Sequence, residues 1–236
     1  MFSPLSKIVL SVWLTIVLIL GFAMPMVPTP EHWYELPLIP GLEEKARNII
    51  FHVPMAWTTM VAFGVSVVFS IRYLMNRNYI EEIRTVAAAG LGTMFCILAT
   101  LTGSLWAKFN WGSFWNWDPR ETSIFILLLI YSAYFALRSA IDNEEKRATL
   151  SSAYAIIAGA TTPFFIFVMP RVMKGLHPGA KGDEMGSAPV AQLHMPPNML
   201  ILFLASIFGF TVFFFWMYNL KVRSLLLEHK QQTSGN

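Results

Sequence analysis

The segment between residues 106 and 122 holds an unusual density of tryptophan. Half of the chain's eight tryptophans fall here, at Trp106, Trp111, Trp115 and Trp117. Tryptophan is common at membrane interfaces, but an interfacial belt spreads its aromatics over all the helices of a bundle. Indole rings gathered in one segment instead favour an aromatic platform. A flat apolar ligand such as a porphyrin would bury a large area on it at little entropic cost.

The same segment ends in the signals of a helix start. Asp118 suits the N-cap, Pro119 the first helical position and Glu121 the position three residues after the cap. We therefore predict that Asp118 caps a helix whose N–H groups and positive dipole end face the ligand site. Arg120 is either a snorkelling interfacial arginine or a bidentate partner for an anionic group such as a haem propionate.

Histidine supplies the second kind of chemistry, because a neutral imidazole is a ligand for haem iron. Of the five histidines, His229 lies in a polar C-terminal tail and is predicted to have no partner. His52 opens an apolar segment, where a titratable ring is costly without a function or a partner. His32, His177 and His194 fall in loops, where the plain alternative is an exposed surface histidine.

The elements that must hold these residues are membrane helices. Hydrophobic residues make up 55% of the 236 residues and charged residues only 13%, too few for the surface of a soluble domain. The apolar residues come in blocks of about 20, the length that crosses a hydrocarbon core of roughly 30 Å. We predict six spans, at residues 8–24, 49–73, 86–106, 123–141, 151–169 and 198–220. The fold class is therefore all-α, a polytopic membrane helix bundle with six transmembrane helices, and residues 1–228 form a single domain.

The basic residues predict that both the N and C termini are cytoplasmic. With the N-terminus inside, the termini and short inner connections carry ten lysines and arginines, whereas the longer outer loops carry seven. The outer loops, at about 25–48, 107–121 and 170–197, are rich in proline, tryptophan or glycine. Loops of this kind commonly carry function on a rigid scaffold. Residues 229–236 form a polar cytoplasmic tail, which we expect to be disordered.

Several classes of function are excluded by what the sequence lacks. The net charge is only +3 and no polybasic run occurs, so nucleic acid is not expected as a partner. The single cysteine, Cys96, lies in an apolar block and belongs to no C-x-x-C-H motif, so any haem would be bound non-covalently. No phosphate-binding loop motif is present, so any ATP would be hydrolysed by a partner.

The run Trp-Gly-x-x-Trp-x-Trp-Asp-x-Arg-x-Thr, from Trp111 to Thr122, is long and specific. It resembles the tryptophan-rich WWD motif of the haem-handling proteins of cytochrome c maturation, the CcmC, CcmF and CcsA superfamily. The arginine two residues after the aspartate is similar to the CcmC-type pattern. The resemblance extends over the whole chain, with six spans, the WWD loop between the third and the fourth, and histidines on both sides of it.

This resemblance implies a non-covalent bis-histidine site for haem b. His52 matches the Arg-x-x-x-x-His-Val-Pro context of one axial ligand, and His177 matches the Leu-His context of the second. His194 also follows a leucine and stays open as the alternative second ligand. Lys45 and Lys108 are available to pair with the haem propionates, but Arg47 and Arg120 are preferred for this role. The haem-contacting residues implied besides the axial ligands are Arg47, Trp111, Trp115, Trp117, Asp118 and Arg120.

The implied function is haem transport by a multi-pass protein of the bacterial cell inner membrane, with its active face periplasmic. The resemblance favours an assembly factor over an enzyme. The implied partners are a periplasmic haem chaperone (CcmE-like), a small membrane subunit (CcmD-like) and ABC transporter subunits (CcmA/CcmB-like). One alternative is a CcsA/CcmF-like haem lyase or synthetase component, although such relatives use a further histidine pair within the membrane. A more distant alternative is a haem b electron-transfer subunit, which usually buries its histidines inside apolar spans.

Overall fold

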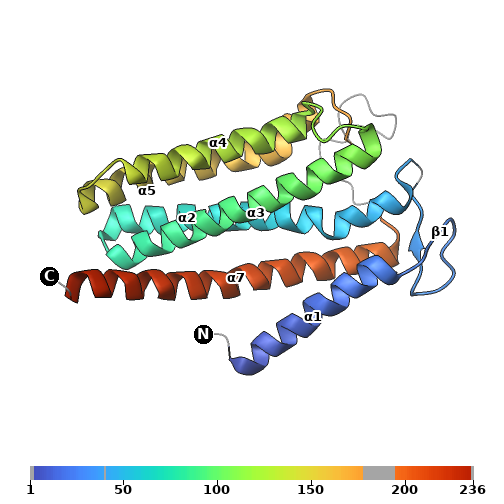
Figure 1. Ribbon diagram of the computed structural model, residues 1–236, viewed down its shortest axis with the longest axis horizontal. Coiled ribbons are helices and arrows are strands. Elements are labelled where there is room, and N and C mark those ends of the chain that lie inside the picture. Colours follow the sequence, from blue (N-terminus) through green and yellow to red (C-terminus); the bar gives the residue numbers. More distant parts are fainter. Residues whose placement is uncertain (1–2, 40, 178–194, 235–236) are drawn as a thin grey trace.

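The computed structural model describes residues 3–39, 41–177 and 195–234 and is built almost entirely from helices (Figure 1). Six helical segments are long and apolar enough to cross a membrane, which confirms the predicted all-α membrane bundle. The elements in chain order are α1 (Pro4–Ala23), β1 (Met26–Val27), β2 (Leu36–Pro37), the 3-10 helix η1 (Glu43–Ile50), α2 (His52–Asn76), α3 (Tyr79–Trp111), α4 (Pro119–Ser139), α5 (Glu144–Pro163), the π-helical segment η2 (Phe164–Val168), α6 (Met169–Val172) and α7 (Pro197–Ser234). The fifth span runs through α5, η2 and α6.

The helices share one long axis, so the connections gather at two ends (Figure 1). We call the end that carries residues 24–39, 41–51, 112–118 and 173–177 the loop end. Both chain termini lie at the opposite end, the terminal end, together with the turns between α2 and α3 and between α4 and α5. The candidate site residues that the structure describes, the tail excepted, therefore belong to helices or loops that meet at the loop end.

α2 is the central helix of the bundle. It packs against α3, α5 and α7, while α4 lies on α3 and α5. Phe63 of α2 stacks on Tyr131 of α4 with ring centroids 3.5 Å apart, and a Cβ on Gly92 of α3 would collide with the Phe63 ring. Close approach through small residues is usual where lipid gives helices no hydrophobic drive to associate. This packing fixes the rotation of α2 and α3, which carry one side of the site.

The chain between α1 and α2 folds across the loop end. β1 pairs with β2 in parallel, and the side chain of Asn198 at the start of α7 donates to the carbonyls of His32 at 3.1 Å and Glu35 at 3.2 Å. Leu36 and Ile50 are fully buried in the core beneath this segment. η1 is held in place by that core, and the start of α2 is positioned with it.

Two helices continue five residues or more past the ends that the sequence predicted. α3 continues to Trp111 and ends at Gly112, whose φ of 82° is the left-handed conformation that favours glycine. The loop expected at 107–121 is therefore reduced to residues 112–118. α7 continues to Ser234, so the expectation of a disordered tail after residue 228 was wrong for these residues. His229, expected to have no partner, lies with its ring centroid 4.3 Å from that of Tyr79, because the extended helix carries it past the start of α3.

Candidate functional site

Asp118 joins the start of α4 to the segment after α6. Its Oδ1 atom accepts a hydrogen bond from Nδ1 of His177 at 2.8 Å, and its Oδ2 atom accepts one from the backbone N–H of Leu176 at 2.6 Å. Burial would raise the pKa of Asp118, but the hydrogen bond and charge of His177, with the N–H groups of Arg120 and Leu176, hold that pKa at about 2. Asp118 is therefore a carboxylate, which only accepts hydrogen bonds, so His177 carries a proton on Nδ1.

The cap predicted for α4 is confirmed. Oδ1 of Asp118 accepts the N–H of Arg120 at 2.9 Å, and Oε2 of Glu121 accepts the N–H groups of Asn116 at 2.7 Å and Asp118 at 3.3 Å. This reciprocal capping box holds residues 116–118 against the helix. The same carboxylate thus caps α4 and orients His177.

His52 is the first residue of α2, as predicted, and its ring meets α3. Its Nδ1 atom lies 3.1 Å from Oγ1 of Thr102, whose hydroxyl donates within α3 to the carbonyl of Leu98 at 2.8 Å. Because the single hydroxyl proton is used there, the oxygen accepts and His52 donates from Nδ1. Gly103 leaves space for the ring, since a Cβ at this position would lie 2.8 Å from Cε1 of His52.

The structure brings His52 and His177 into the same part of the loop end. His52 contacts Thr102 of α3, and Trp106, four residues further along the same helix, packs on the ring of His177. Each imidazole has a protein partner at Nδ1, the hydroxyl of Thr102 for His52 and the carboxylate of Asp118 for His177. Among all the residues that the structure describes, no group of three or more His, Cys, Asp or Glu side chains is placed to hold a bare metal ion. Two imidazoles of this kind suit a metal that brings its other ligands with it, as porphyrin iron does.

The tryptophans form two clusters rather than the single platform expected. In the first cluster, Trp106 and Trp111 pack around His177, with ring centroids 5.5 Å and 4.8 Å from the imidazole. Nε1 of Trp106 donates to the carbonyl of Lys45 at 3.1 Å, which joins the helical end of α3 to η1. This first cluster covers part of the His177 ring, whose side chain remains 16% exposed. Its two tryptophans belong to α3 rather than to a loop.

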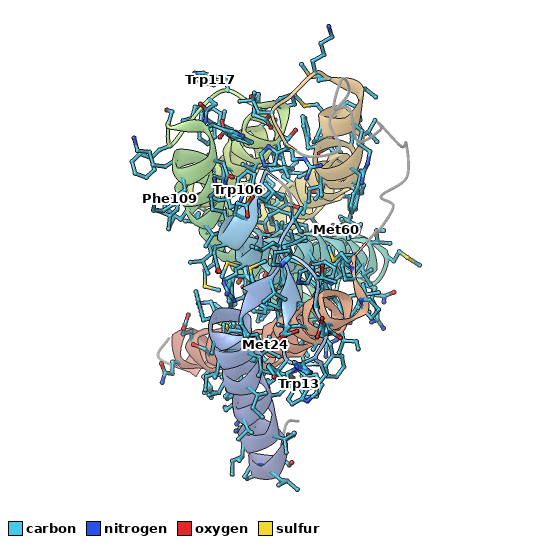
Figure 2. All side chains as sticks on the ribbon, turned by 90° about the vertical axis from the view of Figure 1, so that its right-hand side faces the viewer. Trp13, Met24, Met60, Trp106, Phe109 and Trp117 are labelled. Atoms are coloured by element: carbon cyan, nitrogen blue, oxygen red, sulfur yellow. The ribbon has the colours of Figure 1, made fainter. Side chains whose placement is uncertain are left out.

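The second cluster consists of Trp115, Trp117 and Phe125 and lies at the surface, where Trp117 and Phe125 are exposed and Trp115 is half-buried. Their ring centroids lie between 5.9 Å and 6.5 Å apart. Trp117 is 69% exposed, and its φ of 56° is uncommon for a residue other than glycine. In the view onto the loop end, Trp117 lies at the rim of the molecule, whereas Trp106 lies nearer its middle (Figure 2). The tryptophan segment therefore presents one aromatic cluster to His177 and another to the outside.

Arg47 is placed differently from the expected anion partner. Its Nε atom donates to Oε2 of Glu44 at 2.6 Å, and a terminal nitrogen donates to the carbonyl of Gly21 at 3.0 Å. These contacts tie η1 to α1. Among the described residues, the hydrogen bonds of Arg47 thus serve the packing of the loop end and reach neither histidine of the pair.

Of the other basic candidates, Lys45 lies on η1, Lys108 on α3 and Arg120 on α4. Lys108 donates from Nζ to the carbonyl of Gly112 at 2.8 Å and so closes the C-terminus of α3. Arg120 stands in the first turn of α4, and its backbone N–H donates to Asp118, the carboxylate that also accepts from His177. His194, the alternative second ligand, lies outside the described residues. Arg120 is therefore the expected propionate partner that the structure brings to the histidine pair.

Sequence reasoning missed Thr102 and Gly103. Thr102 stands 50 positions after His52, in the middle of an apolar segment. An adjacent threonine and glycine in a membrane helix indicate a close contact with another helix. They do not indicate which helix or which residue, because that depends on how α2 and α3 are rotated against each other.

Comparison with known proteins places this architecture in a family. Residues 2–235 match the family model described as Heme exporter protein C. The chain belongs to the heme exporter protein C family. A relative from Bradyrhizobium diazoefficiens is 30% identical over 184 residues, which cover 78% of this chain and 68% of the relative. The relative from Rhodobacter capsulatus is 30% identical over 178 residues, covering 75% and 72%, and the one from Escherichia coli K12 is 28% identical over 181 residues, covering 77% and 70%.

The heme exporter protein C match bears on the whole molecule rather than on the tryptophan segment alone. It covers the six membrane-spanning helices and both histidines of the pair. The CcmC-type resemblance inferred from the WWD motif is thereby confirmed at the level of the family.

Proposed function

We propose that this member of the heme exporter protein C family binds haem b non-covalently at the periplasmic face of the bacterial inner membrane. It delivers that haem to a periplasmic haem chaperone for cytochrome c biogenesis. Family membership, six membrane-spanning helices and an imidazole pair at the loop end support this function. His52 and His177 are the axial ligands of the haem iron in this proposal.

The observation that carries the proposal is the shared arrangement of the two imidazoles. An imidazole binds iron through the lone pair of one ring nitrogen, so its other nitrogen must hold the proton. Thr102 accepts from Nδ1 of His52 and Asp118 accepts from Nδ1 of His177, so both rings keep the Nε2 lone pair for a ligand. Such partners select the tautomer and orient the ring of a metal-binding histidine.

The surroundings of the pair suit the rest of a haem. Trp106 and Trp111 supply aromatic surface beside His177, against which a macrocycle can pack. Arg120 and the N-terminus of α4 supply positive charge for propionates. Arg47 would support this site indirectly, by holding η1 to α1.

Delivery requires a surface that a partner can reach, and the second cluster of Trp115, Trp117 and Phe125 is the surface we propose for the chaperone (CcmE-like). Large exposed aromatic side chains are typical centres of protein interfaces. The chain has no phosphate-binding loop. ATP hydrolysis therefore belongs in this proposal to ABC transporter subunits (CcmA/CcmB-like), which act with a small membrane subunit (CcmD-like).

The proposal is tested by absorption spectra of detergent-purified protein loaded with haem, both oxidised and reduced. The wild type is expected to show six-coordinate low-spin haem. His52→Ala and His177→Ala should lose or convert that spectrum, while His194→Ala keeps it. His32→Ala is the matched control, because His32 lies at the loop end but stacks on Tyr34. A wild-type protein that takes up no haem would overturn the proposal. If His194→Ala loses the low-spin spectrum and His177→Ala keeps it, His194 rather than His177 is the second ligand.

A further inference from the structure

We infer that the two histidines are unequal ligands. His177 is supported by the carboxylate of Asp118 and stays on the iron, whereas His52, supported by the neutral hydroxyl of Thr102, is released first when haem leaves. This inference rests on the proposed function, since it assumes that both rings bind one haem iron. It assigns positioning roles to Asp118 and Thr102, which act through the histidines and not on the haem itself.

The support of His177 is ionic and closely held. Its Nδ1–H donates at 2.8 Å to a carboxylate, and hydrogen bonds to charged acceptors are roughly twice as strong as neutral ones. The carboxylate cannot easily turn away, because it also accepts the N–H groups of Leu176 at 2.6 Å and Arg120 at 2.9 Å. An anionic partner at Nδ1 pushes electron density toward Nε2 and makes the imidazole a stronger donor to iron.

The support of His52 is neutral and weaker. The Thr102 hydroxyl accepts from Nδ1 at 3.1 Å while its own proton goes to the carbonyl of Leu98. A hydroxyl oxygen orients the ring and selects its tautomer, but it carries no charge to increase the basicity of Nε2. The ring also has no indole rings packed on it like those around His177, among the ring contacts of the described residues.

The chemistry of release is a ligand exchange. The bond between iron and Nε2 of His52 breaks. An uncharged donor atom of the protein that receives the haem then forms the new bond to iron with its lone pair. The imidazole leaves neutral, with its Nδ1 proton still bonded toward Thr102, so no proton or electron is transferred in this step. Haem then stays on His177 until a second exchange completes the transfer.

The inference is tested by the rate at which haem leaves the purified, haem-loaded protein for an excess of apomyoglobin. Single-ligand variants are loaded in the presence of imidazole, which fills the empty coordination position. His52→Ala should then lose haem only slightly faster than wild type, whereas His177→Ala should lose it at least ~10-fold faster. Equal rates from the two variants would contradict the inference.

The positioning residues are tested by release rate and by the midpoint reduction potential of the bound haem. Asp118→Asn should release haem ~10–100-fold faster and raise the potential, because loss of the anionic partner removes electron density that stabilises ferric iron. Thr102→Val should change the release rate and the reduction potential by less than Asp118→Asn does. Thr102→Ser keeps the hydroxyl and should show wild-type values. Thr100→Val is the matched control, since Thr100 donates to the carbonyl of Cys96 in the same helix. If Thr102→Val raises the potential as much as Asp118→Asn does, the inequality is wrong.

Asp118 also caps α4, so its variant can lower stability for another reason. Asparagine caps as well as aspartate, and thermal unfolding of Asp118→Asn reports any loss of fold. If that variant does not fold, the comparison of His52→Ala with His177→Ala decides the inference without it. A wild type without low-spin haem contradicts the proposed function. A wild type with low-spin haem and two equal ligands contradicts only this inference.

Discussion

Nδ1 of His177 lies 2.8 Å from Oδ1 of Asp118, although the two residues stand 59 positions apart in the chain. The same carboxylate accepts the N–H of Arg120 and so begins α4. One side chain therefore sets both the start of a membrane helix and the orientation of a loop histidine. Changes at Asp118 will consequently affect the stability of the fold and the binding of a ligand together.

The contribution of Asp118 to stability should depend on pH only in acid. Its pKa is lowered from the ordinary 3.8 to about 2, so the stabilisation is present above pH 3.8 and is lost as the pH falls through 2. We expect the difference in Tm between wild type and Asp118→Asn in detergent to be constant from pH 8 to 5 and to disappear toward pH 2. Asp142→Asn, at an exposed turn, is the control. A Tm difference between wild type and Asp118→Asn that disappears between pH 7 and 5 would contradict the lowered pKa of Asp118.

Gly103→Ala should displace the His52 ring. The added Cβ would lie 2.8 Å from Cε1 of His52, a side-chain atom that can move, so the expected result is a lost contact with Thr102 rather than unfolding. Haem affinity should fall by less than about tenfold, because His52 is the more weakly supported of the two ligands. Gly90→Ala is the matched control on the same helix, because nothing lies within 4 Å of the Cβ it would add. Equal haem affinity in the two variants, measured by haem titration, would show that the space beside Gly103 is not needed.

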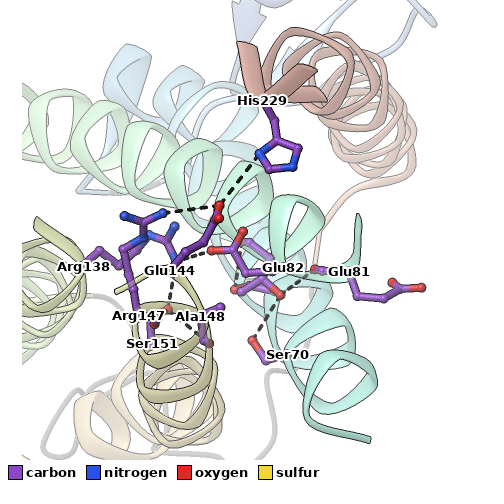
Figure 3. Close-up of polar contacts among 11 residues, drawn as sticks. Ser70, Glu81, Glu82, Arg138, Glu144, Arg147, Ala148, Ser151 and His229 are labelled. Carbon is purple, nitrogen blue, oxygen red and sulfur yellow. Dashed lines mark hydrogen bonds and ion pairs between the residues drawn. The ribbon is translucent and has the colours of Figure 1, made fainter. Parts of the chain in front are cut away.

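The terminal end is held by a buried ion pair that joins α3 to α4 (Figure 3). A terminal nitrogen of Arg138 lies 2.6 Å from Oε1 of Glu82, with the two side chains 15% and 3% exposed, and the arginine also donates to Ser151 at 2.8 Å. Glu82→Ala leaves the arginine charge buried without its partner and should cost about 3–5 kcal/mol of unfolding free energy.

The control for this pair is the more exposed one between Glu144 and Arg147, at 3.7 Å. Glu144→Ala should cost only about 0–1 kcal/mol, because solvent screens such pairs. Chemical denaturation in detergent measures both changes. Similar costs for Glu82→Ala and Glu144→Ala would mean that burial does not determine the value of the Glu82–Arg138 pair.

Trp117→Ala should separate haem binding from haem delivery. The side chain is 69% exposed and contacts Trp115 and Phe125 rather than the histidine pair, so the haem spectrum should stay unchanged. Transfer of haem to the purified chaperone should fall roughly tenfold or more, as is typical for truncation of a central interface tryptophan. Trp33→Ala, which removes a 75% exposed tryptophan from another loop, should transfer normally. Normal transfer by Trp117→Ala would remove the second aromatic cluster from the docking surface.

The sequence by itself determined the features that arise from local or solvent-imposed rules. The six spans were predictable because a bilayer requires about 20 consecutive apolar residues in a helix that satisfies its own backbone. The start of α4 was predictable because a capping box involves only four consecutive residues, from Asp118 to Glu121. His52 at the first position of α2 followed from the edge of an apolar segment.

Only the tertiary structure decided which residues meet. Thr102 as the partner of His52 and Asp118 as the partner of His177 depend on the rotation and depth of packed helices, which no local pattern encodes. The division of the tryptophans had the same cause: α3 continues to Trp111 and turns two of the rings toward His177, while residues 112–118 carry the others outward. Packing between helices separates residues that are neighbours in sequence and joins residues that are 50 or more positions apart.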